Sequence, residues 1–230
     1  MRRARAVALG FVVAGVVAMA LVAVLQRTSL AFTLGVAPAI PAVPLRAGDQ
    51  ACQRPIEVPE DASFDRVSLA VGTYHRAGSP LRVAVRSPAG RTLASGRLAG
   101  GYPDVGAVPT HTIRLDRTVP AMAPIAVCVR NAGPRRVALY GNADAAARTS
   151  TATRDRRPLH VDMTLVFERN PRSMVREVPS MFSRAALFRF PWLGAWAYVV
   201  LGVALAVGGT WLLIRAVTAA APASRDVADR

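Results

Sequence analysis

The chain has 230 residues, of which 52% are apolar, and its 29 basic side chains against 14 acidic ones give a net charge of +15. All 29 basic residues are arginine, a bias that a GC-rich genome produces and that an anionic partner would also favour. Roughly 120 residues lie between two linker-like stretches, which is enough for one compact domain and excludes two.

The first apolar run, Ala6–Leu25, contains no charged residue and follows Arg2, Arg3 and Arg5. As a helix it would be about 30 Å long, which matches the hydrocarbon core of a bilayer. The run therefore predicts a transmembrane helix, and the arginines predict a cytoplasmic N-terminus over residues 1–5. The next part is then extracytoplasmic. Its 23 arginines against 12 acidic residues, counted from 27 to 189, argue against nucleic acid and for anionic lipids, wall polymers or lipid-linked phosphates.

A cleaved signal peptide is the alternative for this run, because Ala18, Met19 and Ala20 match an A-x-A cleavage pattern. Cleavage there would leave an apolar new terminus, and the run is longer than a signal-peptide core, so the pattern favours an uncleaved anchor. Small residues also recur at a spacing of four, at Ala6, Gly10, Ala14 and Ala18. Such a face lets another helix approach closely, although the abundance of alanine and glycine explains the spacing equally well.

Residues 26–50 carry Pro38, Pro41 and Pro44 among small apolar residues. Because proline fixes φ and lacks an N–H, this stretch is interpreted as a linker, either an extended stalk or an edge segment. Over residues 51–169 apolar and polar residues alternate in short runs separated by turn residues, for example at 67–71 and 81–85. A polar loop is expected at 142–158, followed by the last strand at 161–167. Seven or eight such strands predict an all-β, antiparallel β-sandwich. No Trp lies between the two cysteines, which favours a jelly roll over an immunoglobulin-like domain.

The two cysteines, Cys52 and Cys128, both lie in the predicted extracytoplasmic part. In an oxidising compartment such a pair favours a disulfide over two free thiols. A CxxC spacing is absent, so the bridge is interpreted as structural and not as a redox site.

After the sandwich, residues 170–189 place apolar side chains at helical spacing, with basic side chains between them at Arg172, Arg176, Arg184 and Arg189. A basic amphipathic segment of this kind is typical of a membrane interface, where guanidinium groups bind lipid phosphates. Residues 190–214 are uncharged and carry aromatic residues towards both ends, which predicts a second transmembrane helix. The tail, residues 215–230, then returns to the cytoplasm, and the chain is predicted to be a two-pass membrane protein.

Groups that could perform catalysis are few. The three histidines, His75, His111 and His160, match no metal-binding spacing, so no metal or other cofactor is expected. Four carboxylates are scattered among the predicted strands and turns, at Asp65, Asp104, Asp116 and Asp162. Spacing alone does not make them a glycosidase pair, and no GxSxG motif or phosphate-binding glycine loop is present. We interpret the chain as a non-enzyme, with a membrane-anchored hydrolase as an alternative.

A sugar-binding role fits a β-sandwich, because sugar rings stack on exposed aromatic side chains. The predicted domain has few aromatic residues, and Phe64 is expected to be buried. Tyr74, His75 and Arg76 end a strand and open a loop, and together with Tyr102 they are the candidate glycan-binding residues. For each tyrosine, a structural role with a hydrogen-bonded hydroxyl is the alternative.

Five stretches carry a resemblance to a known family: Cys52-Gln53, Phe64-Asp65-Arg66-Val67, Gly72-Thr73-Tyr74, Cys128-Val129-Arg130-Asn131-Ala132-Gly133 and Met181-Phe182-Ser183-Arg184-Ala185-Ala186-Leu187-Phe188. Over about Cys52 to Ile214 the chain resembles bacterial two-span envelope proteins, in which a jelly-roll ectodomain lies between two membrane helices. Similar sandwiches are attached to membrane glycosyltransferases. The shared motifs are mostly strand and turn residues, and the family carries no assigned catalytic residues to transfer.

These observations predict a non-catalytic binding or accessory module in cell-envelope glycan assembly or export. Its expected partners are membrane lipids and a membrane glycosyltransferase or lipid-linked glycan. A scaffold that resembles polysaccharide co-polymerases shares the two-span plan, but those proteins have helix-rich ectodomains, so it ranks lower. The oligomeric state is left open.

Overall fold

A computed structural model of the chain describes residues 2–103, 108–143, 151–155, 157–177 and 194–220. The chain divides into two compact units. One unit comprises Met1–Thr28 and Arg172–Arg230, and we call it the helical unit. The other comprises Ser29–Pro171, and we call it the β unit.

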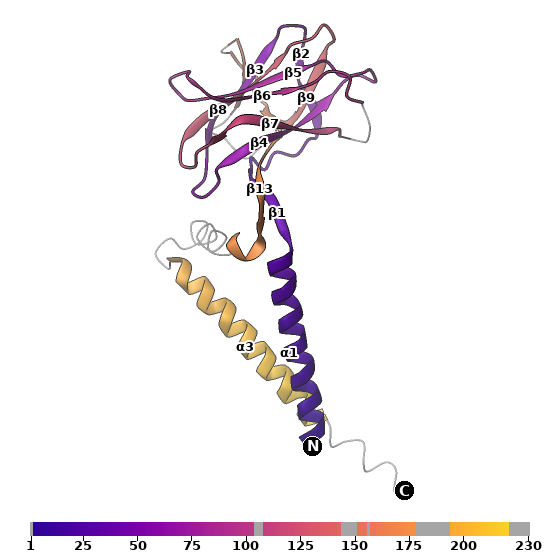
Figure 1. The fold of residues 1–230 in the computed structure, drawn as a ribbon, viewed down its shortest axis with the longest axis vertical. Coiled ribbons are helices and arrows are strands. Elements are labelled where there is room, and N and C mark those ends of the chain that lie inside the picture. The colour runs from indigo at the N-terminus through magenta and orange to yellow at the C-terminus, as the bar shows by residue number, and fades with distance from the viewer. Residues whose placement is uncertain (1, 104–107, 144–150, 156, 178–193, 221–230) are drawn as a thin grey trace. The chain divides into compact units, whose positions relative to one another are not determined.

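The helical unit contains two long helices, α1 (Arg2–Leu25) and α3 (Gly194–Ala220), which contact each other (Figure 1). Both lie where the apolar runs predict helices, and α3 continues past the predicted end at residue 214. Residues 190–193 of the second predicted run fall outside the described part of the chain. Across the described residues, no helix combines the length and the apolar character that a membrane crossing requires.

The β unit is built from strands that all pair in the antiparallel sense where a register is resolved. Their bounds are β1 (Arg27–Thr33), β2 (Ile40–Leu45), β3 (Gln50–Glu57), β4 (Phe64–Gly72), β5 (Leu81–Arg86), β6 (Thr92–Leu98), β7 (Thr110–Val119), β8 (Pro124–Asn131), β9 (Val137–Asn142), β10 (Thr151–Arg154), β11 (Arg157–Pro158), β12 (Asp162–Met163) and β13 (Leu165–Ser173). The main path of hydrogen-bonded neighbours is β1-β13-β4-β7-β6-β5-β8-β3-β10-β11, and β9 joins β2, β12 and the end of β4. The prediction of an all-β antiparallel, sandwich-like domain is confirmed. The finer assignment to a jelly roll stays a prediction.

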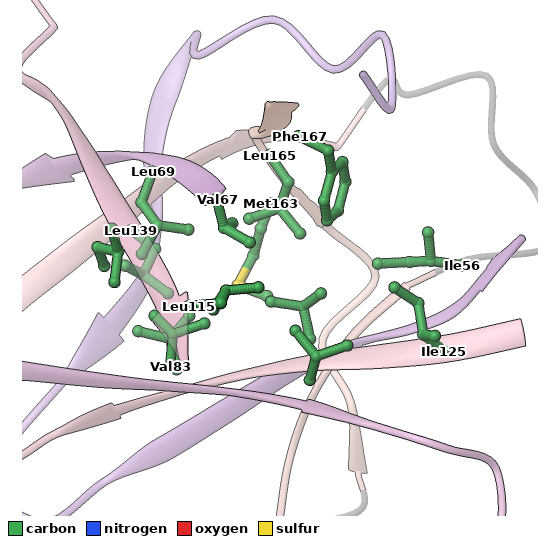
Figure 2. Close-up of a cluster of buried hydrophobic side chains, with 14 of the residues drawn as sticks. Ile56, Val67, Leu69, Val83, Leu115, Ile125, Leu139, Met163, Leu165 and Phe167 are labelled. Atoms are coloured by element: carbon green, nitrogen blue, oxygen red, sulfur yellow. The ribbon is translucent and has the colours of Figure 1, made fainter. Parts of the chain in front are cut away.

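The hydrophobic core lies inside this wrapped sheet and takes side chains from almost every strand (Figure 2). Because side chains alternate between the two faces of a strand, every second residue points into the core. Along β5, Leu81, Val83 and Val85 are buried, and the residues between them are more exposed. An aromatic cluster closes one part of the core, where Phe32 and Phe167 stack with ring centroids 4.2 Å apart and Phe64 packs edge-on. Phe64 is fully buried, as the sequence predicts.

Of the two interpretations of residues 26–50, an extended stalk or an edge segment, the structure agrees with the edge segment over part of the stretch. The stretch contains β1 and β2, and Val43 and Leu45 of β2 are 0% exposed. Among the described strands β2 pairs with β9 alone, so the N–H groups on its other edge have no strand partner to donate to. Its register also shifts between Ile40 and Val43, where Pro41 lies. Prolines fit at such an edge or bulge, which is why a proline-rich stretch can still be a strand.

The predicted loop at residues 142–158 is also partly wrong. It contains β10 and β11, which extend the sheet beyond β3. The single strand expected at 161–167 is instead divided into β12 and β13, which pair with different neighbours, β9 and β4. Strands β10 and β11 add a new edge to the outer surface of the sheet, next to Cys52 and Cys128.

Candidate functional site

The outer face of the sheet around β3 and β8 carries a groove. Alternation sets which side chains face outward there. On β3, Ala51 and Gln53 point into the core, so Gln50 and Cys52 face out, and on β8 the buried Val127 and Val129 leave Cys128 facing the same side.

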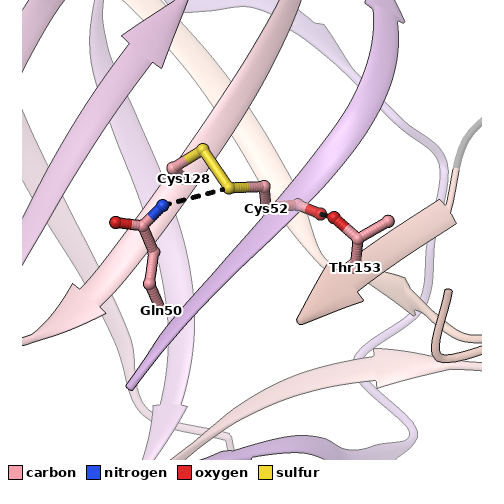
Figure 3. Close-up of a disulfide and its surroundings, with 4 residues drawn as sticks. All are labelled: Gln50, Cys52, Cys128 and Thr153. Carbon is pink, nitrogen blue, oxygen red and sulfur yellow. Dashed lines mark hydrogen bonds between the residues drawn. A yellow bond between two sulfur atoms is a disulfide. The ribbon is translucent and has the colours of Figure 1, made fainter. Parts of the chain in front are cut away.

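Cys52 and Cys128 lie directly opposite each other in the β3–β8 register and form a disulfide, with their Cα atoms 4.0 Å apart (Figure 3). The predicted bridge is confirmed. Gln50 and Thr153 flank it: the Gln50 amide lies 3.4 Å from Cys52 Sγ, and Thr153 Oγ1 donates to the Cys52 carbonyl oxygen at 3.1 Å. The bridge joins residues 76 apart in sequence, so it removes on the order of 4 kcal/mol of unfolded-state entropy.

A groove of about 800 Å³ lies over this disulfide. Its lining combines apolar surface with scattered polar groups and comes from β3, β8, β10, β11 and the turn after β5: Gln50, Cys52, Arg54, Pro55, Arg86, Ser87, Pro88, Gly90, Pro124, Ile125, Ala126, Cys128, Thr151, Thr153, Asp155 and Pro158. Its size falls in the usual range for small-ligand sites. The four proline rings and the disulfide form apolar walls against which the C–H faces of a ligand can pack.

The polar groups of the groove favour a ligand rich in oxygen. Arg54 and Arg86 bring guanidinium groups, and Thr151 and Thr153 bring hydroxyls. Arg86 Nε and Ser87 Oγ are buried and have no hydrogen-bond partner among the described residues. Buried donors are normally paired, so these two groups are available to ligand hydroxyl or acid oxygens.

The loop after β4 presents three of the four predicted glycan-binding residues at the surface. Tyr74 and His75 both adopt left-handed backbone conformations, with φ of 56° and 62°, which cost free energy for residues other than glycine. Tyr74 is 46% exposed, and the Arg136 guanidinium carbon lies 5.2 Å from its ring centroid. His75 and Arg76 are exposed beside it. The loop thus holds an aromatic ring at the surface in a basic environment.

Tyr102, the fourth predicted glycan-binding residue, is buried, which corrects the expectation that its ring is available to a sugar. It is only 8% exposed, its hydroxyl donates to the Ser79 carbonyl oxygen at 2.8 Å, and its ring packs on His111. Burial raises the pKa of Tyr102 to about 12. A Cβ at Gly78 would lie 2.0 Å from the ring, so this tyrosine fills space in the fold and offers no ring face to a sugar.

The remaining predicted contact residues belong to the helical unit. Arg172 and Arg176 are exposed, whereas Arg184 and Arg189 lie outside the described residues. On α1 the small residues Ala6, Gly10, Ala14 and Ala18 are all exposed. A Cβ added at Gly10 would have no described atom within 4 Å, so α3 does not pack closely against α1 at Gly10.

The carboxylates considered for catalysis do not converge. Asp65 forms an ion pair with Arg66 at 3.5 Å, and Asp162 accepts a 2.6 Å hydrogen bond from Gln53. Asp116 accepts two hydrogen bonds from Ser95, from its N–H at 2.7 Å and from its hydroxyl at 3.0 Å, which lower the pKa of Asp116. Asp104 is outside the described residues. Within the described part of the chain, no group of His, Cys, Asp or Glu residues is arranged to hold a metal ion.

The groove itself was missed by sequence reasoning, because its lining depends on which strands become neighbours. Thr151 and Thr153 sat in a predicted loop, and Arg54 and Arg86 carried no local motif. The one available signal was the short alternation Thr151-Ala152-Thr153, in which Ala152 is buried.

No protein-family model matches the chain, and no curated protein matches it. Among solved structures, one that is similar is an arabinose-bound α-L-arabinofuranosidase, with 13% sequence identity and a TM-score of 0.28. The match covers 60% of this chain and 22% of the enzyme's chain. At that TM-score the likeness carries no argument about fold or function.

Proposed function

We propose that this chain is a membrane-anchored, non-catalytic module that binds glycan in the assembly or export of the cell envelope. The observation that carries the proposal is the groove over the disulfide, in which proline rings and the sulfur bridge lie beside arginine and threonine side chains. Sugars present the same mixture, with apolar C–H faces and a rim of hydroxyls or acid groups. The exposed Tyr74 provides a second surface on which a sugar ring can stack.

Membrane anchoring is part of the proposal. The uncharged run Ala6–Leu25 has the length of a span, and large apolar side chains are exposed along both helices, among them Phe11, Leu25, Trp196 and Leu205. Exposed apolar surface of this extent is unfavourable in water and favourable in lipid. We place both termini in the cytoplasm and the β unit outside, where a disulfide is stable. Arg172 and Arg176, with Arg184 and Arg189, would then bind lipid phosphates.

The resemblance to two-span envelope proteins supports an accessory role beside a membrane glycosyltransferase. The small-residue face of α1 would pack against a helix of that enzyme. A pull-down of tagged full-length protein from its native membrane in mild detergent, with mass spectrometry of the retained proteins and lipids, tests this role. We expect a glycosyltransferase or lipid-linked sugar in the eluate, and its loss when Gly10 and Ala14 are both changed to Leu. Recovery of the chain with bulk phospholipid alone would contradict the accessory role.

Glycan binding is tested with two matched alanines on neighbouring strands. Ala126 on β8 lines the groove, whereas Ala84 on β5 faces outward on the same sheet and does not line it. Full-length protein in nanodiscs would be applied to a glycan array as wild type, Ala126→Trp and Ala84→Trp. We expect retention to fall at least tenfold only for Ala126→Trp, because the indole fills the groove. Equal retention by the two variants would contradict the groove as the binding site.

A further inference from the structure

We infer that four arginines on the outer face of the β unit form a binding track for a linear anionic glycan. They are Arg130 on β8, Arg82 on β5, Arg97 on β6 and Arg114 on β7, and we call them the arginine row. This inference rests on the proposed glycan-binding function and specifies the class of ligand.

The strand register brings the four residues side by side. Arg82 lies opposite Arg130 on one neighbouring strand and opposite Arg97 on the other. Gly96 lies opposite Leu115 in the antiparallel β6–β7 pair. Continuing that antiparallel register by one residue places Arg97 next to Arg114. The two strands approach closely there, because a Cβ on Gly96 would be 2.5 Å from the Arg114 carbonyl oxygen.

All four side chains also point to the same face. Their neighbours along each strand, such as Leu81, Val83, Leu115 and Val129, are buried in the core, and the four arginines are exposed. Adjacent strands lie about 4.8 Å apart, so three steps across β8, β5, β6 and β7 give a row roughly 14 Å long. The row runs across the strands and not along any one of them, because β8, β5, β6 and β7 are successive neighbours in the sheet.

Among the described residues, none of the four arginines forms an ion pair. Like charges directly opposite each other on neighbouring strands are destabilising. The neighbouring arginine on β4, Arg66, lies opposite Arg114 and is paired with Asp65. The acidic residues nearest to the row, Asp116 and Glu168, accept hydrogen bonds from Ser95 and from Ser68 and Thr112. A genome bias towards arginine explains why arginine is common here, but it does not explain four on one face in register.

The row leads directly into the groove. Arg130 lies opposite Gln50 on β3, and Gln50 lines the groove together with Arg54 and Arg86. A polymer that crosses the strands would therefore pass from the row into the groove and meet guanidinium groups in both. Guanidinium binds carboxylate and phosphate oxygens through paired hydrogen bonds.

An anionic glycan fits this surface better than a nucleic acid does. Single-stranded nucleic acids are held by a basic groove together with aromatic side chains on which the bases stack. Neither the row nor the lining of the groove contains an aromatic residue. The apolar groups present are proline rings, an isoleucine and the disulfide, which suit the C–H faces of sugars.

The test measures binding of full-length protein in nanodiscs of zwitterionic lipid, so that anionic headgroups do not compete. The probes are polygalacturonate, poly(glycerol phosphate), neutral dextran and single-stranded DNA, the anionic ones compared at equal charge. The row variant is Arg82→Gln/Arg97→Gln. The control variant, Arg91→Gln/Arg117→Gln, removes the same charge from exposed arginines off the row. Melting temperature is recorded for both, and the row variant should melt no lower than wild type because like-charge repulsion is relieved.

We expect the row variant to lose at least tenfold in affinity for polygalacturonate or poly(glycerol phosphate), and the control variant to lose less than twofold. The slope of log affinity against log salt should become shallower by about 1.4 to 1.8 in the row variant, because two phosphate or carboxylate contacts are gone and each contributes about 0.7 to 0.9. Which of the two anionic polymers binds more tightly identifies the acid group, and either result supports the inference.

Other results would overturn it, and they separate this inference from the proposed function. Equal losses in the row and control variants would mean a general charge effect. Dextran bound as tightly as the anionic polymers, and lost in Ala126→Trp, would refute the anionic track while leaving the glycan-binding groove intact. DNA bound as tightly as the anionic glycans would refute the glycan assignment. If none of the saccharides binds, the inference and the proposed function fail together.

Discussion

Replacing Gln53 by methionine should destabilise the β unit far more than the same change at Gln50, although both residues lie on β3. Gln53 is 0% exposed and links two elements: its amide nitrogen donates to Asp162 Oδ1 at 2.6 Å, and its amide oxygen accepts from the Met163 N–H at 2.9 Å. Gln50 faces outward, and within the described part of the chain its side chain makes one polar contact, 3.4 Å to Cys52 Sγ. Methionine has a similar length and flexibility, so the change removes hydrogen bonds with little change in volume.

The expected cost follows from the two groups that lose their partner. A buried backbone N–H left unpaired costs about 1–3 kcal/mol, and a buried carboxylate that loses a donor costs at least as much. We therefore expect Gln53→Met to lower the free energy of unfolding by about 3–5 kcal/mol. At the outward position, Gln50→Met should change it by about 0.5 kcal/mol or less.

The effect should also depend on pH, which separates it from a packing defect. Burial raises the pKa of Asp162, and the hydrogen bond from Gln53 opposes that rise. Without Gln53 the pKa of Asp162 rises further, so the cost of the variant is largest at pH 8, where the carboxylate is charged, and smaller near pH 4. Urea unfolding of the full chain in detergent micelles, followed by circular dichroism at both pH values, measures this. Equal stability of the two variants, or a cost that grows on acidification, would refute the reasoning.

Two further predictions use the same unfolding assay. Phe32→Ala should lower the free energy of unfolding by about 3–5 kcal/mol, because the Phe32 ring stacks in the aromatic cluster of the core. The control Leu30→Ala, on the exposed side of β1, should lower it by less than about 1 kcal/mol. Equal small losses would mean that β1 does not pack into the core. Asp162→Asn should raise stability at pH 7–8: the folded pKa of Asp162 lies above its unfolded value, so the ionised form lowers stability at high pH, and this penalty disappears as pH falls through the folded pKa. The gain should therefore vanish near pH 4, and a gain that is independent of pH would contradict the assignment.

Much of the fold could be predicted because alternation is a local signal. The runs around Val67–Val71 and Leu81–Val85 predicted β4 and β5, and the placement of Cys52 and Cys128 outside a reducing compartment predicted their disulfide. For residues 26–50 the prolines left two interpretations open, an extended stalk or an edge segment, and sequence alone did not decide between them. Proline is compatible with an edge strand, and whether β2 is an edge depends on a pairing with β9 that is remote in sequence.

The candidate site was less accessible to sequence reasoning because it depends on register and on burial. Tyr74 and Tyr102 are the same residue type in similar turn-rich surroundings, yet one is exposed beside Arg136 and the other fills the space above Gly78. The local sequence does not determine which of the two tyrosines is buried with its hydroxyl hydrogen-bonded, as Tyr102 is to the Ser79 carbonyl oxygen. The groove likewise needs β10 to add beside β3, and the four residues of β10 are too few for alternation to predict.

The arginine row is the extreme case of this dependence. Its four members are irregularly spaced along the chain, and they form a row only when three separate strand pairings take the observed register. A slip of one residue in any pairing would turn one arginine towards the core, at the cost of burying a charge. The row is therefore compatible with one arrangement of β5, β6, β7 and β8 only. Loss of anion binding in Arg82→Gln/Arg97→Gln, with normal binding in the control variant, would thus support both the ligand class and the strand order on which it rests.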